Sequence, residues 1–164
     1  MHAEAIPSIH FRVAVSADRP RLIPLINSAF AVEKFLESTR TDDAHLAAMM
    51  EKGRILVAED PSGTILACVY VELRVPRGYL GMLAVDPAHQ RSGLGRRLME
   101  AAEERFRQIG CEAVDITVLS LRPELPPIYR RFGYVETGIE EFHPTRPLRE
   151  GLRCHCIVMS KQLA

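Results

Sequence analysis

The residues with the clearest chemical potential lie in the segment 87–99, where arginines and glycines gather at the expected start of a helix. Three arginines stand there without an acidic neighbour, and two glycines fall in the first turn. The residues concerned are Arg91, Gly93, Gly95, Arg96 and Arg97. This composition opposes ordinary helix design, because the helix dipole favours acids at that end and each glycine costs up to about 1 kcal/mol relative to alanine.

An anion bound at this helix end would account for the whole pattern. Bare backbone N–H groups can approach phosphate oxygens at a helix N-terminus, and guanidinium groups neutralise the phosphate charge. The alternative interpretation is a solvated, arginine-rich turn with incidental glycines. Two common phosphate motifs do not fit: a P-loop requires a lysine that this segment lacks, and a Rossmann fingerprint requires a third glycine where Leu98 stands.

The elements that must position this segment alternate along the chain. Hydrophobic periodicity and turn residues predict a helix from Leu94 to Ile109, ended by Gly110. Further helices are expected at residues 18–30, 41–50 and 124–131, and strands at 9–15, 54–59, 64–75, 79–85, 111–119, 132–138 and 152–161. This order implies a mixed α/β sheet flanked by helices, antiparallel at short hairpins and parallel where a helix crosses over.

Length and composition bound the functions that are possible. The 164 residues predict one domain, residues 1–164, and the 47% hydrophobic and 26% charged fractions are ordinary for a globular protein. Lys+Arg and Asp+Glu both number 21, and this neutrality argues against a general nucleic-acid binder. No apolar stretch approaches the roughly 20 residues of a membrane span, and residues 1–5 carry no secretory pattern. We therefore expect a cytoplasmic protein without nucleic-acid or membrane partners.

Four cysteines are consistent with that expectation. Cys68 and Cys111 stand in apolar runs, where a free cysteine behaves as a small hydrophobe. Cys154 and Cys156 flank His155, but no second pair of ligands stands at zinc spacing. We expect both cysteines on one face of a buried strand, with metal or redox chemistry as the alternative, and predict no metal cofactor.

Two segments resemble one known family. Gln90–Gly95 resembles the acyl-CoA signature Q/R-x-x-G-x-G/A of the GNAT N-acetyltransferase superfamily, and Ile128–Tyr134 resembles the aromatic pattern that closes its domain. The resemblance extends from about Ile9 to Lys161, although the first 60 residues match only in element order. It implies a largely antiparallel sheet of six to seven strands with about four helices, in which one strand pair splays apart at the cofactor site.

The resemblance also implies a binding site for acetyl-CoA. In this family the amides of the signature loop hold the pyrophosphate, and the pantetheine pairs with the preceding strand. The expected cofactor-binding residues are Leu83, Ala84, Val85, Gln90, Arg91, Ser92, Gly93, Leu94, Gly95 and Arg96. The family commonly has an asparagine after the next strand, and Ser120 is its nearest polar stand-in here.

The implied reaction is direct attack of an amine on the thioester, so a nucleophilic cysteine is not required. Tyr129 matches the family's usual general acid to the CoA thiolate, and a phenol with a pKa near 10 is protonated at pH 7. A core aromatic beside Phe132 is the alternative role. An alkylammonium with a pKa near 10.4 must also lose a proton. Glu33, Glu72 and His143 are candidate bases, with Glu72 preferred; surface roles for all three, or a water chain, are the alternatives.

The resemblance implies an N-acetyltransferase acting on a small-molecule or peptide amine, and it allows a homodimer. The segment 143–149 borders the acceptor site in this family, so its arginines could favour an anionic acceptor, unless the loop is merely solvated. The alternative function is a non-catalytic acyl-CoA-binding or sensing module, against which the presence of Tyr129 argues. Nucleotide binding is a third interpretation.

Overall fold

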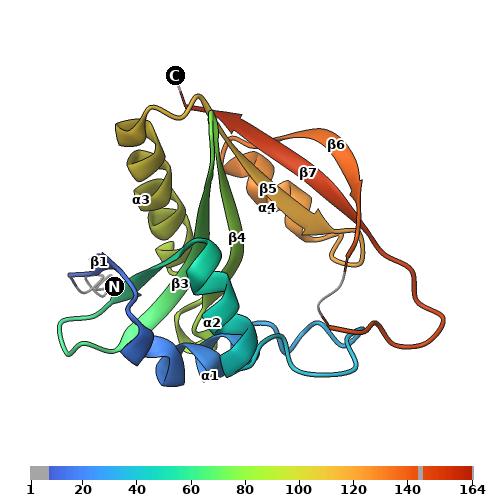
Figure 1. Cartoon of the computed structure of the whole chain (residues 1–164), viewed down its shortest axis with the longest axis horizontal. Coiled ribbons are helices and arrows are strands. Elements are labelled where there is room, and N and C mark those ends of the chain that lie inside the picture. The colour runs from blue at the N-terminus through green and yellow to red at the C-terminus, as the bar shows by residue number, and fades with distance from the viewer. Residues whose placement is uncertain (1–7, 144–145, 164) are drawn as a thin grey trace, which may run out of the picture.

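One continuous seven-stranded sheet carries helices on both of its faces (Figure 1). The computed structural model describes residues 8–143 and 146–163. The prediction that residues 1–5 carry no secretory leader concerns residues outside these ranges, as do the two ends of the predicted domain. The strands are β1 (His10–Val13), β2 (Arg54–Glu59), β3 (Ile65–Arg74), β4 (Arg77–Val85), β5 (Ala113–Leu119), β6 (Val135–Glu141) and β7 (His155–Gln162). The helices are α1 (Arg19–Ala29), α2 (Asp43–Lys52), α3 (Leu94–Ile109) and α4 (Leu125–Arg131), with short 3-10 turns η1 (Ser16–Asp18) and η2 (Pro87–His89).

The strands lie in the order β1-β2-β3-β4-β5-β7-β6. Every neighbouring pair is antiparallel except β4 and β5, which are parallel because α3 connects them. The predicted mixed, largely antiparallel sheet with four helices is therefore confirmed, and so is the element order.

Helices α1 and α2 cover one face of the sheet. Leu22 and Ile26 of α1 and Leu46 of α2 are fully buried against side chains of β2 and β3. Asp42 caps α2, since its carboxylate accepts a 2.8 Å hydrogen bond from the N–H of His45. Pro24 lies in the interior of α1.

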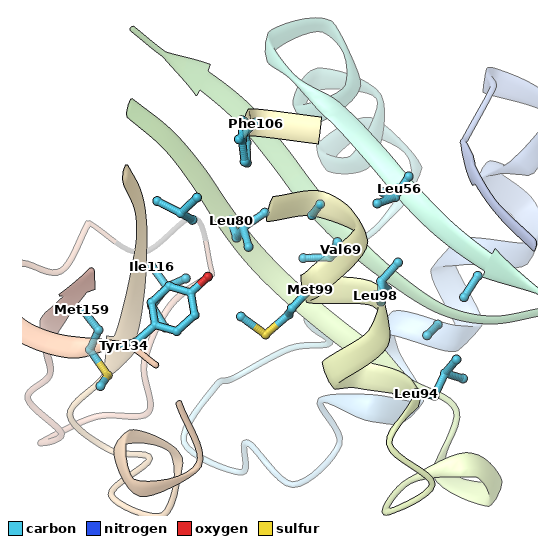
Figure 2. Close-up of a cluster of buried hydrophobic side chains, with 14 of the residues drawn as sticks. Leu56, Val69, Leu80, Leu94, Leu98, Met99, Phe106, Ile116, Tyr134 and Met159 are labelled. Atoms are coloured by element: carbon cyan, nitrogen blue, oxygen red, sulfur yellow. The ribbon is translucent and has the colours of Figure 1, made fainter. Parts of the chain in front are cut away.

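Helix α3 covers the opposite face and, with α4, encloses the larger core cluster. Leu98 and Met99 lie against the sheet near Val69 and Leu80, and Leu94 belongs to the same buried cluster at the start of α3 (Figure 2). Burying each of these side chains stabilises the fold by about 1.5–3 kcal/mol. The same burial fixes the start of α3, and therefore the loop before it, against β4.

The feature that opens the sheet is a bulge in β4. Cys68 and Tyr70 of β3 are opposite Ala84 and Gly81, so one residue of β3 faces two of β4, and Met82 has a positive φ of 50°. On its other edge β4 pairs with β5 only as far as Leu80 and Ile116, so the two strands separate beyond this point (Figure 1). The predicted splayed pair is confirmed.

Two boundaries near the C-terminus differ from the prediction. Strand β6 begins at Val135 instead of Phe132, because Gly133 forms a turn with a φ of 97°. Strand β7 begins at His155, so Cys154 precedes it and the prediction that Cys154 shares a buried strand face with Cys156 is wrong. Cys156 is buried, as predicted.

Residues 8–143 and 146–163 contain no group of three His, Cys, Asp or Glu side chains that could hold a metal ion. No helix in these ranges has the length and apolarity to span a membrane.

Candidate functional site

A cavity of about 860 Å³ occupies the gap between the separating strands β4 and β5. Its walls come from β4, β5, α4, the loop before α3 and the loop after α1. Because α1 lies on one face of the sheet and α3 and α4 on the other, the cavity joins the two faces through the gap. Two reactants approaching from opposite faces can therefore meet inside it.

The loop before α3 presents unpaired backbone donors at one end of this cavity. The Asp86 carboxylate accepts from the N–H of Ala88 at 2.8 Å, and Gln90 Nε2 donates to the Val85 carbonyl at 3.2 Å, which together fold the loop back onto β4. Among the described residues, none accepts a hydrogen bond from the backbone N–H groups of residues 90–96. The first N–H groups of a helix attract anions.

Two residues of this loop adopt the left-handed region. Arg91 has a φ of 64° and Gly93, the residue before α3, has a φ of 81°. A non-glycine residue in this conformation costs about 1–2 kcal/mol, and such strain is concentrated at functional sites. Turns of this kind can bring successive backbone N–H groups to face one anion, as a cradle for a phosphate group requires.

Gly95 keeps the first turn of α3 open toward β4. A Cβ at this position would contact Val85 Cγ2 at 3.4 Å and Leu83 Cδ2 at 3.7 Å, and all three residues line the cavity. Glycine therefore leaves room for a ligand between the helix and the strand. Beyond Leu80 the edge of β4 that faces β5 has no strand partner in the part of the chain that the structure describes, so its backbone groups are available to the same ligand.

The positive charges at this end differ in part from the sequence expectation. Arg91 and Arg96 line the cavity, and Arg131 at the end of α4 adds a cation that the sequence did not single out. Arg97 instead packs against the ring of Phe11 on β1, away from the cavity lining. Arg96 is also paired at 3.1 Å with an acid one turn further along α3, Glu100.

Tyr129 projects from α4 into the cavity. Its ring packs edge-on against Tyr134 and Phe132, with ring centres 6.3 and 6.1 Å away. Its hydroxyl makes no hydrogen bond with the part of the chain that the structure describes. Burial raises the pKa of Tyr129 to about 12, although the charge of nearby Arg122 acts in the opposite direction. The phenol is therefore a protonated donor at neutral pH.

Glu72, the preferred candidate base, lies outside the cavity lining. Its Oε2 accepts hydrogen bonds from the Tyr70 hydroxyl at 3.0 Å and from Arg74 at 3.2 Å, and Lys52 is 4.0 Å from Oε1. Burial raises the pKa of Glu72, but the bonds from Arg74 and Tyr70 outweigh it and the net pKa is lowered. A carboxyl held in this way is a weak proton acceptor.

Several other residues predicted for the site lie outside the cavity lining. Ser120 lies outside the lining and joins β5 to β7: its hydroxyl accepts from the N–H of His155 at 3.0 Å. Ala84 and Leu94 are buried in the two core clusters, and Ser92 donates to the carbonyl of His89 at 2.5 Å. These residues shape the site without lining it. The candidate base His143 is exposed and outside the lining.

Glu33 is the candidate base that the structure brings into the cavity, together with two arginines that sequence reasoning did not assign. Arg122 Nη1 donates to Glu33 Oε2 at 2.7 Å, and Arg40 Nη1 lies 3.7 Å from Glu33 Oε1. All three residues line the cavity. Because Glu33 and Arg122 are 89 positions apart, no local sequence signal could have paired them.

Comparison with known proteins supplies independent information. A family model described as an acetyltransferase (GNAT) domain matches residues 26–144. A mycothiol acetyltransferase from Propionibacterium freudenreichii is 28% identical over 149 residues, which are 85% of this chain and 46% of that protein. A probable glucosamine 6-phosphate N-acetyltransferase from Oryza sativa is 36% identical over 107 residues, which are 59% of this chain and 63% of that protein.

The chain therefore spans about half to two thirds of the length of these two curated relatives. In fold, the crystal structure of the ribosomal-protein-S18-alanine N-acetyltransferase from Escherichia coli superposes with a TM-score of 0.75, covering 96% of this chain and 95% of that chain. The sequence identity of that pair is 19%, so the likeness concerns the fold alone.

Proposed function

The chain belongs to the GNAT acetyltransferase family, and from this premise we propose that it transfers an acetyl group from acetyl-CoA to the nitrogen of a primary amine. The observation that carries the proposal is the row of N–H groups at residues 90–96 that have no acceptor among the described residues, at the mouth of a cavity that passes between β4 and β5. The row of N–H groups suits a phosphate-bearing cofactor, and the passage between the strands lets a second reactant approach from the other face.

The residues that hold the cofactor are divided by chemistry. The amides of residues 90–96 and the guanidinium groups of Arg91, Arg96 and Arg131 bind its phosphates. The unpaired edge of β4 from Gly81 to Val85 pairs with its amide-containing arm, in the way one strand pairs with another. When bound, acetyl-CoA supplies a thioester whose carbonyl carbon the amine nitrogen attacks directly.

Tyr129 acts as the general acid in this proposal. Its hydroxyl donates a proton to the departing thiolate sulfur, which otherwise would attack the new amide and reverse the reaction. The nitrogen loses its proton to a base that passes it on to solvent, and Tyr129 recovers its own from solvent, so no net charge accumulates on the protein. General acid catalysis of this kind contributes about 10²- to 10⁴-fold in rate.

Two carboxylates are candidates for the base that removes the proton from the amine nitrogen. Glu72 remains a prediction, and the hydrogen bonds it accepts from Tyr70 and Arg74 make it a weaker proton acceptor. Glu33 lines the cavity and is therefore the better supported of the two. The neutral net charge argues against nucleic-acid partners, while the lack of membrane partners, a cytoplasmic location and a homodimer remain predictions from the sequence and its family resemblance.

The acceptor class at this level is a primary amine. One relative is named for glucosamine 6-phosphate and one structural neighbour for the alanine of ribosomal protein S18. The proposal therefore includes both small-molecule and peptide amines.

The test is turnover of acetyl-CoA across a panel of primary amines, measured as thiol release and as acetylated amine by mass spectrometry. We expect amine-dependent thiol release that fits one acetylated product per thiol. Calorimetric binding of CoA without turnover on any amine would support the alternative of a sensing module and overturn the proposal. Competition by ATP as strong as that by CoA would instead support nucleotide binding.

A further inference from the structure

Away from residues 90–96, here called the phosphate loop, the cavity contains a buried carboxylate oxygen that has no hydrogen-bond partner among the described residues. The side chain of Glu33 is only 3% exposed, and its Oε2 is occupied by the bond from Arg122. Its Oε1 has no hydrogen-bond partner in the described residues, although Arg40 Nη1 forms a long ion pair with it at 3.7 Å. A buried acceptor left in this state is expensive to maintain, so its retention points to a donor that arrives from outside.

A buried donor without a partner lies beside it. Arg40 Nε is likewise buried and has no hydrogen-bond partner among the described residues. The guanidinium group of Arg40 packs over the ring of Phe30 at 4.8 Å, an arrangement that leaves its edge for an anion. Glu33 and Arg40 line the same cavity, so one ligand can reach both.

The position of Arg40 is fixed by the backbone next to it. Asn27 of α1 accepts from the N–H of Thr41 at 2.9 Å and donates to the Thr41 carbonyl at 3.1 Å. Arg122 is fixed in turn, since its Nε donates to Glu124 at 2.5 Å while Nη1 holds Glu33. The unpartnered acceptor and donor are therefore parts of a built site and not ends of free side chains.

A simple amine satisfies only half of this arrangement. An amine that bonds to Glu33 Oε1 leaves Arg40 Nε without a partner, and an anion at Arg40 without an amine leaves Glu33 Oε1 as it is. A ligand that carries both groups a few bonds apart satisfies both atoms, and charge-assisted hydrogen bonds are the strong ones.

We propose that the acceptor is an amine that also carries an anionic group, carboxylate or phosphate, with its nitrogen bound by Glu33 Oε1 and its anion by Arg40. This inference rests on the acetyl transfer proposed above and narrows its acceptor class. The proton that the ammonium loses passes to the Glu33 carboxylate, and the freed nitrogen lies in the cavity that Tyr129 enters from the opposite face.

The test compares matched acceptors that differ only in the anion. Glycine against glycinamide tests the carboxylate, and glucosamine 6-phosphate against glucosamine tests the phosphate. We expect the anionic member of at least one pair to have a kcat/KM higher by about 10- to 100-fold, and the pair concerned identifies the anion. Neutral members that react as well as the anionic ones in both pairs would overturn the inference and leave the proposed transfer intact.

Variants separate binding from a general loss of structure. Arg40→Gln is expected to remove the preference for the anionic member while the KM for acetyl-CoA stays unchanged. Glu33→Gln is expected to lower kcat/KM for both members of a pair together. Arg54→Gln, an exposed residue of β2 outside the cavity, is the control and should react as the unaltered protein does. An Arg40→Gln protein with an unchanged melting temperature and an undiminished preference would overturn the inference. Absence of turnover with every amine, with CoA still bound, would instead overturn both proposals.

Discussion

The hydroxyl of Tyr134 donates a 2.7 Å hydrogen bond to Oε2 of Glu103, a residue 31 positions earlier that is itself buried in α3. Lys161 of β7 completes the group by donating to Glu103 Oε1 and to the Phe132 carbonyl, both at 2.9 Å. The three side chains join α3, the turn after α4 and β7. Since the Tyr129 ring packs on Tyr134, this network also positions the proposed general acid.

Lys161→Met is therefore expected to lower the free energy of unfolding by about 3–5 kcal/mol, because it leaves the Glu103 carboxylate buried without its cation. Urea unfolding followed by circular dichroism measures the change. The double variant Glu103→Leu, Lys161→Met is expected to recover part of the loss, since no buried charge remains. A loss below about 1 kcal/mol in Lys161→Met would show that the ion pair is not a stabilising one.

Tyr129→Phe tests the general acid directly. Because the hydroxyl makes no hydrogen bond with the described residues, its removal should leave the fold and the KM for acetyl-CoA unchanged. We expect kcat to fall by about 10²-fold or more. Unchanged kcat in Tyr129→Phe would remove this residue from the mechanism.

The pH dependence of kcat gives a second measure of Tyr129. An acid must be protonated to act, so its contribution is lost only as the pH rises through its pKa, which burial raises to about 12. We expect no fall of kcat that depends on Tyr129 between pH 7 and about pH 10. A descending limb in this range that disappears in Tyr129→Phe would contradict the raised pKa.

Two glycines before and within α3 should respond oppositely to alanine. Gly95→Ala is expected to raise the free energy of unfolding by up to about 1 kcal/mol, since alanine favours the helix and the nearest atoms, at 3.4 Å, allow a Cβ. Its CoA affinity should fall about tenfold, because the methyl group occupies the approach between α3 and β4. Gly93→Ala should instead destabilise the fold by about 1–2 kcal/mol, since its φ is 81°. Calorimetry and urea unfolding distinguish the two results, and an unchanged CoA affinity in Gly95→Ala would contradict the proposed approach.

The ion pairs of Asp18 should make the free energy of unfolding fall in acid. Its carboxylate accepts bonds from Arg12 at 2.8 and 3.0 Å and from Arg21 at 2.6 Å, and the bonds from Arg12 hold the pKa of Asp18 well below its usual range. A lowered folded-state pKa contributes stability that is complete above the unfolded value near 3.9 and is lost as the pH falls below it. Urea unfolding between pH 2.5 and 7 measures this contribution. The difference in free energy of unfolding between the unaltered protein and Asp18→Asn should therefore become smaller toward low pH. A difference that is constant with pH would contradict this.

Much of the fold could be predicted because its signals are local. Gly53 and Gly110 end helices α2 and α3, and the Asp42 cap begins α2, each as the residue type predicts. Strand β6 was misplaced because all of its residues are exposed, so it has no alternation between buried and exposed positions.

The candidate site divides in the same way. The phosphate loop is one continuous segment and was found from its composition. The acceptor side consists of Glu33, Arg40 and Arg122, which come together only through packing of distant loops. The preference for Glu72 followed from its place on a long strand, and the bonds it makes to Tyr70 and Arg74 depend on side-chain geometry that sequence does not specify.

The loop after α1 and the loop before β7 lie side by side at one end of the molecule (Figure 1). Leu36 and Leu148 pair as a β-bridge, and the backbone bonds Glu37 N–H to Pro147 O at 3.0 Å and Arg149 N–H to Phe35 O at 2.8 Å flank it. Neither loop is an independent module, because each supplies the other's backbone partners. Exchanging only one of these loops with that of a relative, in order to change acceptor preference, would therefore break this pairing. Both loops have to be exchanged together.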